Sequence, residues 1–144
     1  MGELQRFSVS VDRELLDRFD RRIRADGYPT RSKAIADLMR QGLVRRSWKA
    51  GQEVAAAILM VFDHHRRELV GRLTSIQHEY HHQIVSSQHI HLDHDHCLEI
   101  VVVRGKARLV EELAARLRAT KGVQYCTLAA ASTGTEFREG GEEG

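Results

Sequence analysis

The sequence predicts an α+β protein with two units: a strand with two helices, and then a unit of the order βαββαβ. Two observations predict this fold. Residues 5–11 alternate strictly between polar and apolar side chains before two helical repeats, and the remaining chain holds four strand-like segments and two helical ones. The βαββαβ order is the ferredoxin-like arrangement.

The first unit begins with a half-buried strand at residues 5–11. Its apolar face consists of Phe7, Val9 and Val11, and its polar face consists of Arg6, Ser8 and Ser10. Asp12 then caps a helix that Gly27 ends, and a second helix opens at Pro29 and Thr30 and ends near Ser47. The apolar positions of these helices recur at helical spacing, as Leu15, Leu16, Phe19 and Ile23 and as Ile35, Leu38, Met39 and Leu43.

A single copy of this unit is incomplete. A lone strand cannot satisfy its backbone hydrogen bonds, and about 45 residues with few large apolar side chains bury little core. Two copies that pair strand to strand remove both deficits and form a ribbon whose polar face fits a DNA major groove. A polar strand face alone would be a solvated surface, but this strand precedes two capped helices in a basic segment. We therefore expect a dimeric ribbon-helix-helix unit over residues 1–48 that contacts DNA.

The second unit follows a hinge at residues 49–52. Its first strand, the apolar run at 54–62, is too continuous for a strand with a solvated face and fits a sheet interior. The later elements are predicted as a helix over 63–80, strands over 84–92 and 97–103, a helix over 106–120 and a strand over 123–130. This unit spans residues 53–131. Residues 132–144 are rich in Gly and Glu without apolar periodicity, and we expect a disordered tail there.

Composition narrows the class of protein. The 144 residues contain no run of about 18 apolar residues and no signal-peptide pattern, so we expect a soluble, cytoplasmic protein without a membrane partner. Residues 1–50 hold twelve Lys and Arg against seven Asp and Glu, whereas residues 51–144 hold ten against thirteen. A basic first third favours contact with phosphates, and the remainder is typical of a regulatory or assembly domain.

Histidines concentrate in the second unit, where seven of the nine lie between residues 78 and 96. His89 and His91 are two apart on a predicted strand and face the same way, and a tight hairpin returns Cys97 beside them. Two imidazoles and a thiolate suit a borderline-soft divalent ion: Ni, Cu, Zn or Co. The competing interpretation is a His-rich loop without a defined site. It applies most strongly to His64–His65 and His81–His82, because adjacent histidines on a helix point in different directions.

Three protein ligands leave a four-coordinate ion one short. The spacing leaves open whether the fourth ligand is His78, His94, His96, a water or an atom of another chain. A catalytic zinc site also has three protein ligands and an open position, but no HExxH motif is present. Ordinary turn propensity explains the nearest acids, Asp93 and Asp95, so we expect no enzyme.

Glu99 follows Cys97 by two residues and lies on the same strand face. It is either an acceptor that orients a ligand imidazole or an exposed strand glutamate, and the spacing does not decide between the two.

The residues assembled so far closely resemble the nickel-responsive regulator family of bacterial and archaeal repressors. The resemblance covers roughly residues 5–131. In the first unit it rests on RFSVSVDRELLDRFD and GYPTRSKAI, a ribbon-helix-helix signature. In the second it rests on QHEYHHQ, on the spacing of eleven positions between His78 and His89, and on HIHLDHDHCLEI, which together are highly specific.

The resemblance implies a metal cofactor, Ni(II), one per subunit. The ion is four-coordinate and near-planar, bound by His89, His91 and Cys97 of one subunit and by His78 of a neighbour. Planar geometry favours Ni(II) or Cu(II) over Zn(II), which prefers a tetrahedron.

The resemblance also implies a homotetramer, a dimer of dimers with four ferredoxin-like (ACT-type) domains at its centre and two DNA-binding dimers flanking them. Nickel loading stabilises an arrangement in which both dimers engage half-sites of one palindromic double-stranded operator, which shuts off nickel uptake genes. By the same analogy, Arg6, Ser8 and Ser10 read bases, while Arg66 and Arg67 contact phosphates.

One departure from the family pattern is Lys33, which stands where relatives carry an acidic residue, four residues before Asp37. In those relatives the acid and the aspartate help hold a cation between the domains when DNA is bound. Here the Lys33 ammonium can supply the positive charge itself by pairing with Asp37 at helical i, i+4 spacing.

Three other functions fit parts of the pattern. The first is a repressor of the same architecture tuned to Cu or Co, because the affinity order places Cu(II) above Ni(II). The second is a nickel-sequestering or delivery protein whose DNA binding does not depend on metal. The third is a small-molecule sensor, since ACT-type folds often bind amino acids.

Overall fold

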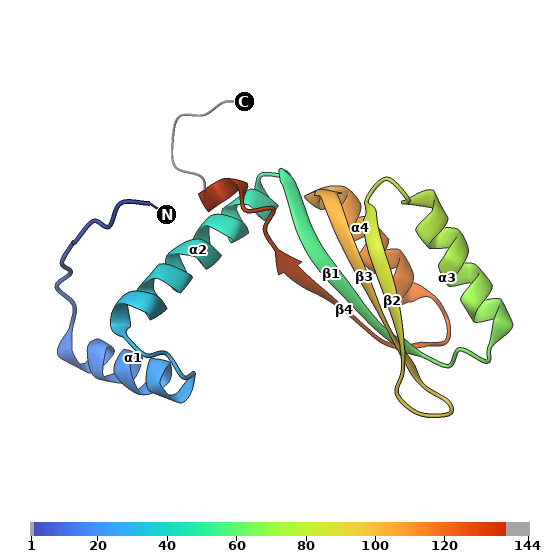
Figure 1. Cartoon of the computed structure of the whole chain (residues 1–144), viewed down its shortest axis with the longest axis horizontal. Helices are drawn as coiled ribbons and strands as arrows, with labels where there is room; N and C mark the ends of the chain where they lie inside the picture. Colours follow the sequence, from blue (N-terminus) through green and yellow to red (C-terminus); the bar gives the residue numbers. More distant parts are fainter. Residues whose placement is uncertain (1, 138–144) are drawn as a thin grey trace. The chain divides into compact units, whose positions relative to one another are not determined.

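The structure is a computed structural model that describes residues 2–137, apart from the side chain of Glu136 (Figure 1). Two compact units divide the described residues, one formed by residues 2–43 with Phe137 and the other by residues 44–136. The element order is two helices followed by β1, α3, β2, β3, α4 and β4. This order agrees with the predicted α+β fold.

The first unit contains α1 (Arg13–Ala25) and the start of α2 (Arg31–Lys49), whose last residues belong to the second unit. α1 begins and ends where the sequence predicts, and α2 ends two residues beyond the predicted Ser47. The Asp12 carboxylate accepts the backbone N–H groups of Glu14 and Leu15 at 2.9 and 3.3 Å, and so caps α1. Gly27 follows α1 with a φ of +83°, a left-handed conformation that costs glycine little. Thr30 caps α2 through its hydroxyl oxygen, which accepts the Lys33 N–H at 3.1 Å.

The predicted strand over residues 5–11 is not a strand in the isolated chain. The structure assigns neither strand nor helix to residues 2–12. The physical reason is that a strand needs a partner for its ladder hydrogen bonds, and one chain supplies none here. Only two apolar side chains of this unit, Ile23 and Ala34, are buried among the described residues. The remaining large apolar side chains of the unit are half-buried or exposed, and Phe7, Val9, Val11, Leu15, Leu38, Met39 and Leu43 are exposed.

The second unit is a four-stranded antiparallel sheet of order β2-β3-β1-β4. Its strands are β1 (Glu53–Phe62), β2 (Ile84–His91), β3 (Cys97–Lys106) and β4 (Val123–Ala131). Because β1 lies between β3 and β4, the apolar run of the sequence does form a sheet interior, as predicted. β3 continues three residues beyond the predicted end, because it pairs with β1 as far as Lys106 opposite Glu53.

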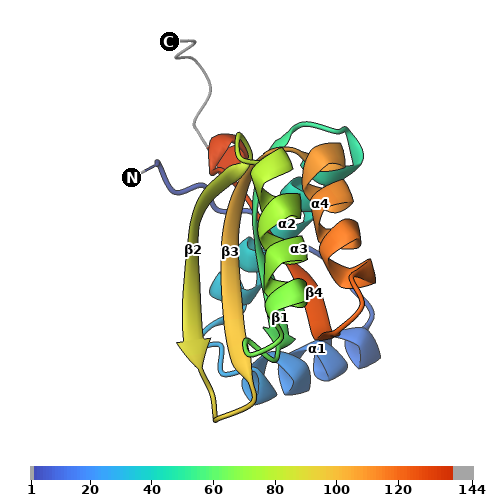
Figure 2. The same ribbon diagram turned by 90° about the vertical axis from the view of Figure 1, so that its right-hand side faces the viewer.

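Helices α3 (Arg67–Glu79) and α4 (Ala107–Ala119) lie on the same face of this sheet (Figure 2). The core lies between the helices and this face, and alternate residues of β1 from Val54 to Phe62 point into it. From the helices, Leu69, Leu73, Val110, Leu113 and Leu117 complete the core. Leu109 of α4 is only half-buried.

The predicted helix over 63–80 begins four residues late, at Arg67. Residues 63–66 form a turn instead, in which the Asp63 carbonyl accepts the Arg66 N–H at 3.2 Å and the Asp63 carboxylate accepts the His65 N–H at 2.9 Å. An aspartate that binds the backbone two residues later favours a turn over a helix. The helical periodicity of the sequence therefore overestimated the length of α3.

Of the predicted tail, residues 132–137 are described, and Thr135–Phe137 form a short 3-10 helix, η1. Residues 138–144 lie outside the described residues. Among the helices of the described range, none is long and apolar enough to span a membrane.

Removal of a core side chain tests this packing. Leu113 of α4 is fully buried, so Leu113→Ala should lower the free energy of unfolding by about 2–5 kcal/mol, through lost burial and the cavity left behind. Chemical denaturation followed by circular dichroism measures the loss. Leu109→Ala on the same helix is the control and should cost less, because Leu109 is half-buried. Equal losses would contradict the assignment of the core face.

Candidate functional site

The β2–β3 hairpin places the predicted metal ligands at one end of the sheet. In its register His91 lies opposite Cys97 and His89 lies opposite Glu99. Residues directly opposite each other on neighbouring strands lie on the same face of the sheet, and so do residues i and i+2 of one strand. Three predicted ligands and the predicted acceptor Glu99 therefore gather on one face, the face that also carries the buried side chains of β3.

The turn of this hairpin is built by Asp93. Its carboxylate accepts the backbone N–H groups of Asp95 and His96, each at 2.9 Å, and lies 2.8 Å from Nδ1 of His96. These interactions, with the His96 contact the largest, hold the pKa of Asp93 below its usual range. His94 contacts Asp95 at 3.0 Å in the same turn. Asp93 thus acts as a turn former, and His96 is engaged in holding the turn.

Glu99 is not an exposed strand residue, because only 3% of its surface is accessible. Its Oε1 atom lies 3.2 Å from Nε2 of His89 and accepts a hydrogen bond of 3.3 Å from the side-chain amide of Gln77 on α3. A buried carboxylate in this position fixes the orientation of the imidazole that it contacts. Gln77 is a site residue that the sequence reasoning missed, and only its position one residue before His78 could have drawn attention to it.

Cys97 lies at the start of β3 and is 1% exposed. Burial raises the pKa of its thiol, and the negative charges of Glu99 and Asp63 raise the pKa further, while a hydrogen bond with the backbone of Phe62 acts in the opposite direction. The free thiol is therefore protonated at neutral pH. A bound cation would reverse this preference, because metal coordination deprotonates a thiol.

The described side chains are not arranged as a closed coordination sphere. The ligand atoms of His89, His91 and Cys97 do not all lie within 4.8 Å of one another among the described residues. His89 is turned toward Glu99, and the His91 ring packs edge to face on His64 with centroids 4.6 Å apart.

His78 does not share the direction of Gln77 on α3. Successive helix residues project about 100° apart, and the neighbouring Gln77 is the one that reaches Glu99. His78 itself is exposed near the C-terminal end of α3, where its ring stacks on His81 with centroids 5.6 Å apart.

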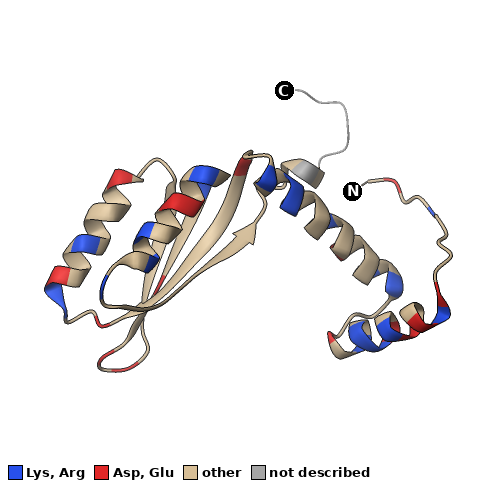
Figure 3. Cartoon of the chain, turned by 180° about the vertical axis from the view of Figure 1, so that it is seen from behind, with Lys and Arg blue, Asp and Glu red and all other residues tan. Residues whose placement is uncertain are grey.

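The candidate DNA contacts lie in two places. Arg6, Ser8 and Ser10 are exposed in the N-terminal segment, and basic side chains are distributed over α1 and α2 (Figure 3). Arg66 and Arg67 are exposed at the basic start of α3, and neither forms an ion pair with a described residue. Arginines without a carboxylate partner remain available to phosphates.

Lys33 pairs with Asp37 at 2.9 Å, the i, i+4 contact that the sequence predicts. Arg40 approaches the same carboxylate oxygen at 3.0 Å. The Lys33 hydrogen bond is the largest cause of the lowered pKa of Asp37. In this chain two basic side chains therefore already neutralise the aspartate.

Comparison with known proteins supplies the family context of these two units. Residues 5–46 match the family described as "Ribbon-helix-helix protein, copG family", and residues 55–131 match "NikR C terminal nickel binding domain". The structure also resembles an uncharacterised protein from Thermotoga maritima, with a TM-score of 0.51 over 56% of this chain and all of that chain. At 11% identity this likeness concerns the fold alone.

Curated relatives match over nearly their whole length. A protein of Chlorobium limicola is 48% identical over 93% of this chain and 100% of its own. Proteins of Syntrophus aciditrophicus and Solibacter usitatus are 47% and 45% identical, over 93% and 96% of this chain and 98% and 100% of theirs. All three carry the name "Putative nickel-responsive regulator".

The environment of Cys97 gives a prediction that needs no metal. The rate at which iodoacetamide alkylates Cys97, followed by mass spectrometry, should be low at pH 7. Because only the thiolate reacts, this rate should still increase as the pH is raised above about 8.5, the usual pKa of a thiol. Glu99→Gln should shift this profile to lower pH by removing a neighbouring negative charge. Cys126, which Glu99 does not influence, is the internal control. A profile that is unchanged in Glu99→Gln would show that the carboxylate does not act on the thiol.

Proposed function

The chain belongs to the family of nickel-responsive regulators, DNA-binding proteins rather than enzymes, and we propose that it is a nickel-dependent transcriptional repressor. In this proposal it works in the cytoplasm, where it binds a palindromic operator and controls genes of nickel uptake. The observation that carries the proposal is the β2–β3 register, which sets His91 opposite Cys97 and His89 opposite Glu99. In the same chain, residues 5–46 match a ribbon-helix-helix family.

The donor set fits nickel. Two imidazole nitrogens and a thiolate are ligands that suit a borderline-soft divalent ion, and Cys97, His89 and His91 supply them from one hairpin. The contact of Glu99 with His89 supports a role for this carboxylate in orienting a ligand ring. Nickel bound there, one ion per subunit, would supply the positive charge that stabilises the Cys97 thiolate, and His89 and His91 would hold the ion through their imidazole nitrogens.

A fourth donor from another subunit is part of the proposal. His78 is exposed, and the preceding Gln77 is the residue that contacts Glu99 of the hairpin. We assign His78 of a neighbouring subunit to the remaining position.

Apolar surfaces in both units support assembly as a homotetramer, a dimer of dimers. In the first unit, residues Phe7, Val9 and Val11 expose the apolar face that would lie inside a two-stranded ribbon. In the second unit, the sheet face opposite the helices carries Ala57, Leu59 and Ile100, only partly buried within the described chain. A soluble monomer rarely exposes apolar patches of this kind.

The repressor function is tested by DNA binding with a panel of metals. A gel shift on the DNA upstream of the gene that encodes this protein should show sequence-specific binding with Ni(II) and little binding with chelator. The reason is that only the nickel-loaded protein holds the arrangement that binds the operator. Parallel lanes with Cu(II), Zn(II) and Co(II) show which metal ion promotes DNA binding most strongly. Tight nickel binding without any effect on DNA affinity would favour a sequestering or delivery protein, and a stronger response to Cu(II) or Co(II) would reassign the metal.

The two groups of DNA contacts should behave differently. Arg6→Ala should lose about 1–3 kcal/mol of discrimination between operator and random DNA, because base contacts carry the specificity.

Arg66→Ala with Arg67→Ala should instead weaken binding to all DNA and make the affinity less dependent on salt concentration, because phosphate contacts release counterions. Footprinting at several salt concentrations measures both. Equal loss on both kinds of DNA for Arg6→Ala, or an unchanged salt slope for the double variant, would remove the corresponding assignment.

The shared metal site has a complementation test. His78→Ala and Cys97→Ala should each lose tight nickel binding, and Cys97→Ala should also lose the thiolate-to-nickel absorption in the near ultraviolet. When the two variants are unfolded and refolded together, a Cys97-bearing chain receives His78 from the Cys97→Ala chain. One intact site should reappear per mixed interface, beside one doubly defective site.

Mixing gives a different result for a site contained in one chain, because every chain would then still lack one ligand. Verified mixed oligomers that recover neither tight binding nor the absorption band would sink the assignment of His78 to a neighbouring subunit.

A further inference from the structure

The last turn of α3 carries His78, and the end of a helix is the part that its own hydrogen bonds hold most weakly. The last four carbonyl groups of a helix have no partner within it, so a final turn frays unless other contacts hold it. The residue after α3 is Tyr80 and not a capping glycine. The position of His78 therefore depends on side chains that tie this turn to other elements.

Two such ties flank His78 in the sequence. On one side, the side-chain amide of Gln77 donates a hydrogen bond of 3.3 Å to the buried carboxylate on β3. On the other side, Glu79 and Tyr80 both contact Arg116 of α4. The Arg116 guanidinium donates to both carboxylate oxygens of Glu79, with Nη2 at 3.3 Å from Oε1. It also lies over the Tyr80 ring, 5.6 Å from the ring centroid.

The contacts of Arg116 restrict the turn in direction as well as in distance. Tyr80 is half-buried and packs against the core of the second unit, so Arg116 joins an exposed carboxylate to a side chain that the core anchors. Hydrogen bonds with Glu79, the larger cause, and with Tyr80 raise the pKa of the guanidinium. Two parallel N–H donors fix the geometry of a carboxylate in a way that a lysine ammonium cannot.

We propose that Arg116 is a positioning residue for the nickel site of a neighbouring subunit, because it holds the turn that presents His78. This inference rests on the function proposed above, in which His78 is the fourth ligand. Arg116 itself does not touch the metal. Its contribution is that the turn is ordered before metal binds, so less conformational freedom is lost when the His78 imidazole coordinates the ion.

The other two arginines of α4 make different contacts. Arg108 pairs with Glu112 at 3.1 Å, four residues later on the same helix. Arg118 donates to the backbone carbonyl of Cys126 on β4 at 3.5 Å. Among the ion pairs and hydrogen bonds of the described residues, Arg116 is thus the α4 arginine that reaches α3. Arg108→Met removes an ion pair of the same helix without touching α3, which makes it the matched control.

The mixed oligomer of His78→Ala and Cys97→Ala chains separates the two roles of a subunit. Its intact site takes three ligands from the His78→Ala chain and His78 from the Cys97→Ala chain, which we call the donor chain. Arg116→Met in the donor chain should weaken nickel binding at this site by about tenfold, the low end of the loss that follows removal of an outer partner of a metal ligand. Nickel titration followed by the near-ultraviolet thiolate band measures the affinity.

The same substitution placed in the His78→Ala chain should leave the recovered site unchanged, because that chain presents no histidine at position 78. A general loss of structure would act in either chain, so dependence on the chain is the signature of positioning. Arg108→Met should have no effect in the donor chain. Glu79→Gln breaks the Arg116 ion pair from the other side and should reproduce the loss there.

Circular dichroism shows whether each variant is folded, and Glu79→Gln decides the question should Arg116→Met unfold. If Arg116→Met weakens the site equally in both chains, in neither chain, or no more than Arg108→Met does, the inference is wrong. A parent mixture that recovers no tight site overturns the shared nickel site and this inference with it. A recovered parent site that does not respond to the loss of the Arg116 ion pair overturns the inference alone.

Discussion

The register between β2 and β3 is the constraint on which the candidate metal centre depends. With His91 opposite Cys97 and His89 opposite Glu99, four polar side chains point to the helix-covered face at the turn end of the hairpin. A slip of one residue would turn His89 and His91 to the opposite face while Cys97 stayed in place. Two features hold this register: the turn that Asp93 closes, and the ten-residue pairing of β3 with β1 on its other side.

A second constraint is that neither unit can bury its apolar surface alone. The first unit buries two apolar residues, Ile23 and Ala34, among those described, and leaves its N-terminal segment without backbone partners. Bidentate pairing of Arg31 with Asp20, at 2.8 and 2.7 Å, ties α1 to α2 but adds no core. The second unit has a complete core on one face of its sheet only. The assembly proposed above would cover these surfaces, and regulation would act through it.

The sequence was most informative where one physical rule dominated. The central position of β1 followed from its unbroken apolar run, and the ends of α1 followed from Asp12 and Gly27. Side-chain identity also indicated the pairing of Lys33 with Asp37. In each of these cases the deciding interactions lie within a few residues or follow from burial alone, so the pattern contains them.

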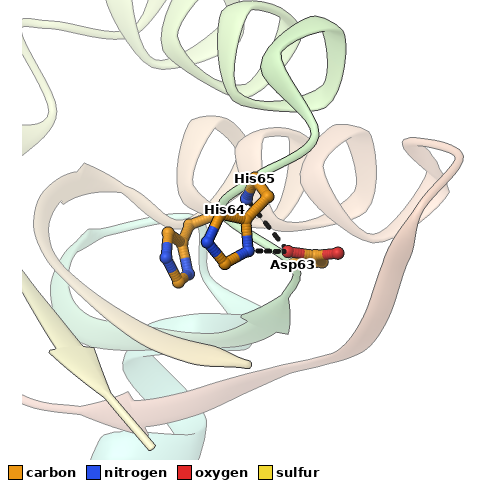
Figure 4. Close-up of side chains that lie close together, drawn as sticks. All are labelled: Asp63, His64 and His65. Atoms are coloured by element: carbon orange, nitrogen blue, oxygen red, sulfur yellow. Dashed lines mark hydrogen bonds and ion pairs between the residues drawn. The ribbon is translucent and has the colours of Figure 1, made fainter. Parts of the chain in front are cut away.

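Prediction failed where a local side chain or a missing partner decided the structure. Periodicity extended α3 back to residue 63, but the Asp63 carboxylate captures the His65 N–H and makes a turn. That error also misplaced His64 and His65, which were treated as diverging neighbours on a helix, whereas their ring centroids lie 4.1 Å apart (Figure 4). The strand over 5–11 failed for another reason, since its hydrogen-bond partners belong to no residue of the same chain. Gln77 was missed because no pattern connects an amide on α3 with a carboxylate 22 residues later on β3.

A ligand can shift an equilibrium between arrangements only by binding them with different affinities. A site made from Cys97, His89 and His91 alone would bind nickel equally in every arrangement of the subunits, and so would transmit nothing to distant DNA contacts. Under the proposed function, His78 of a neighbouring subunit makes the affinity depend on how the subunits are placed. In this proposal a ligand from a second subunit is therefore more than a detail of coordination. It would let the free energy of metal binding select one quaternary arrangement, and by reciprocity that arrangement, once held by DNA, would tighten the hold on the metal.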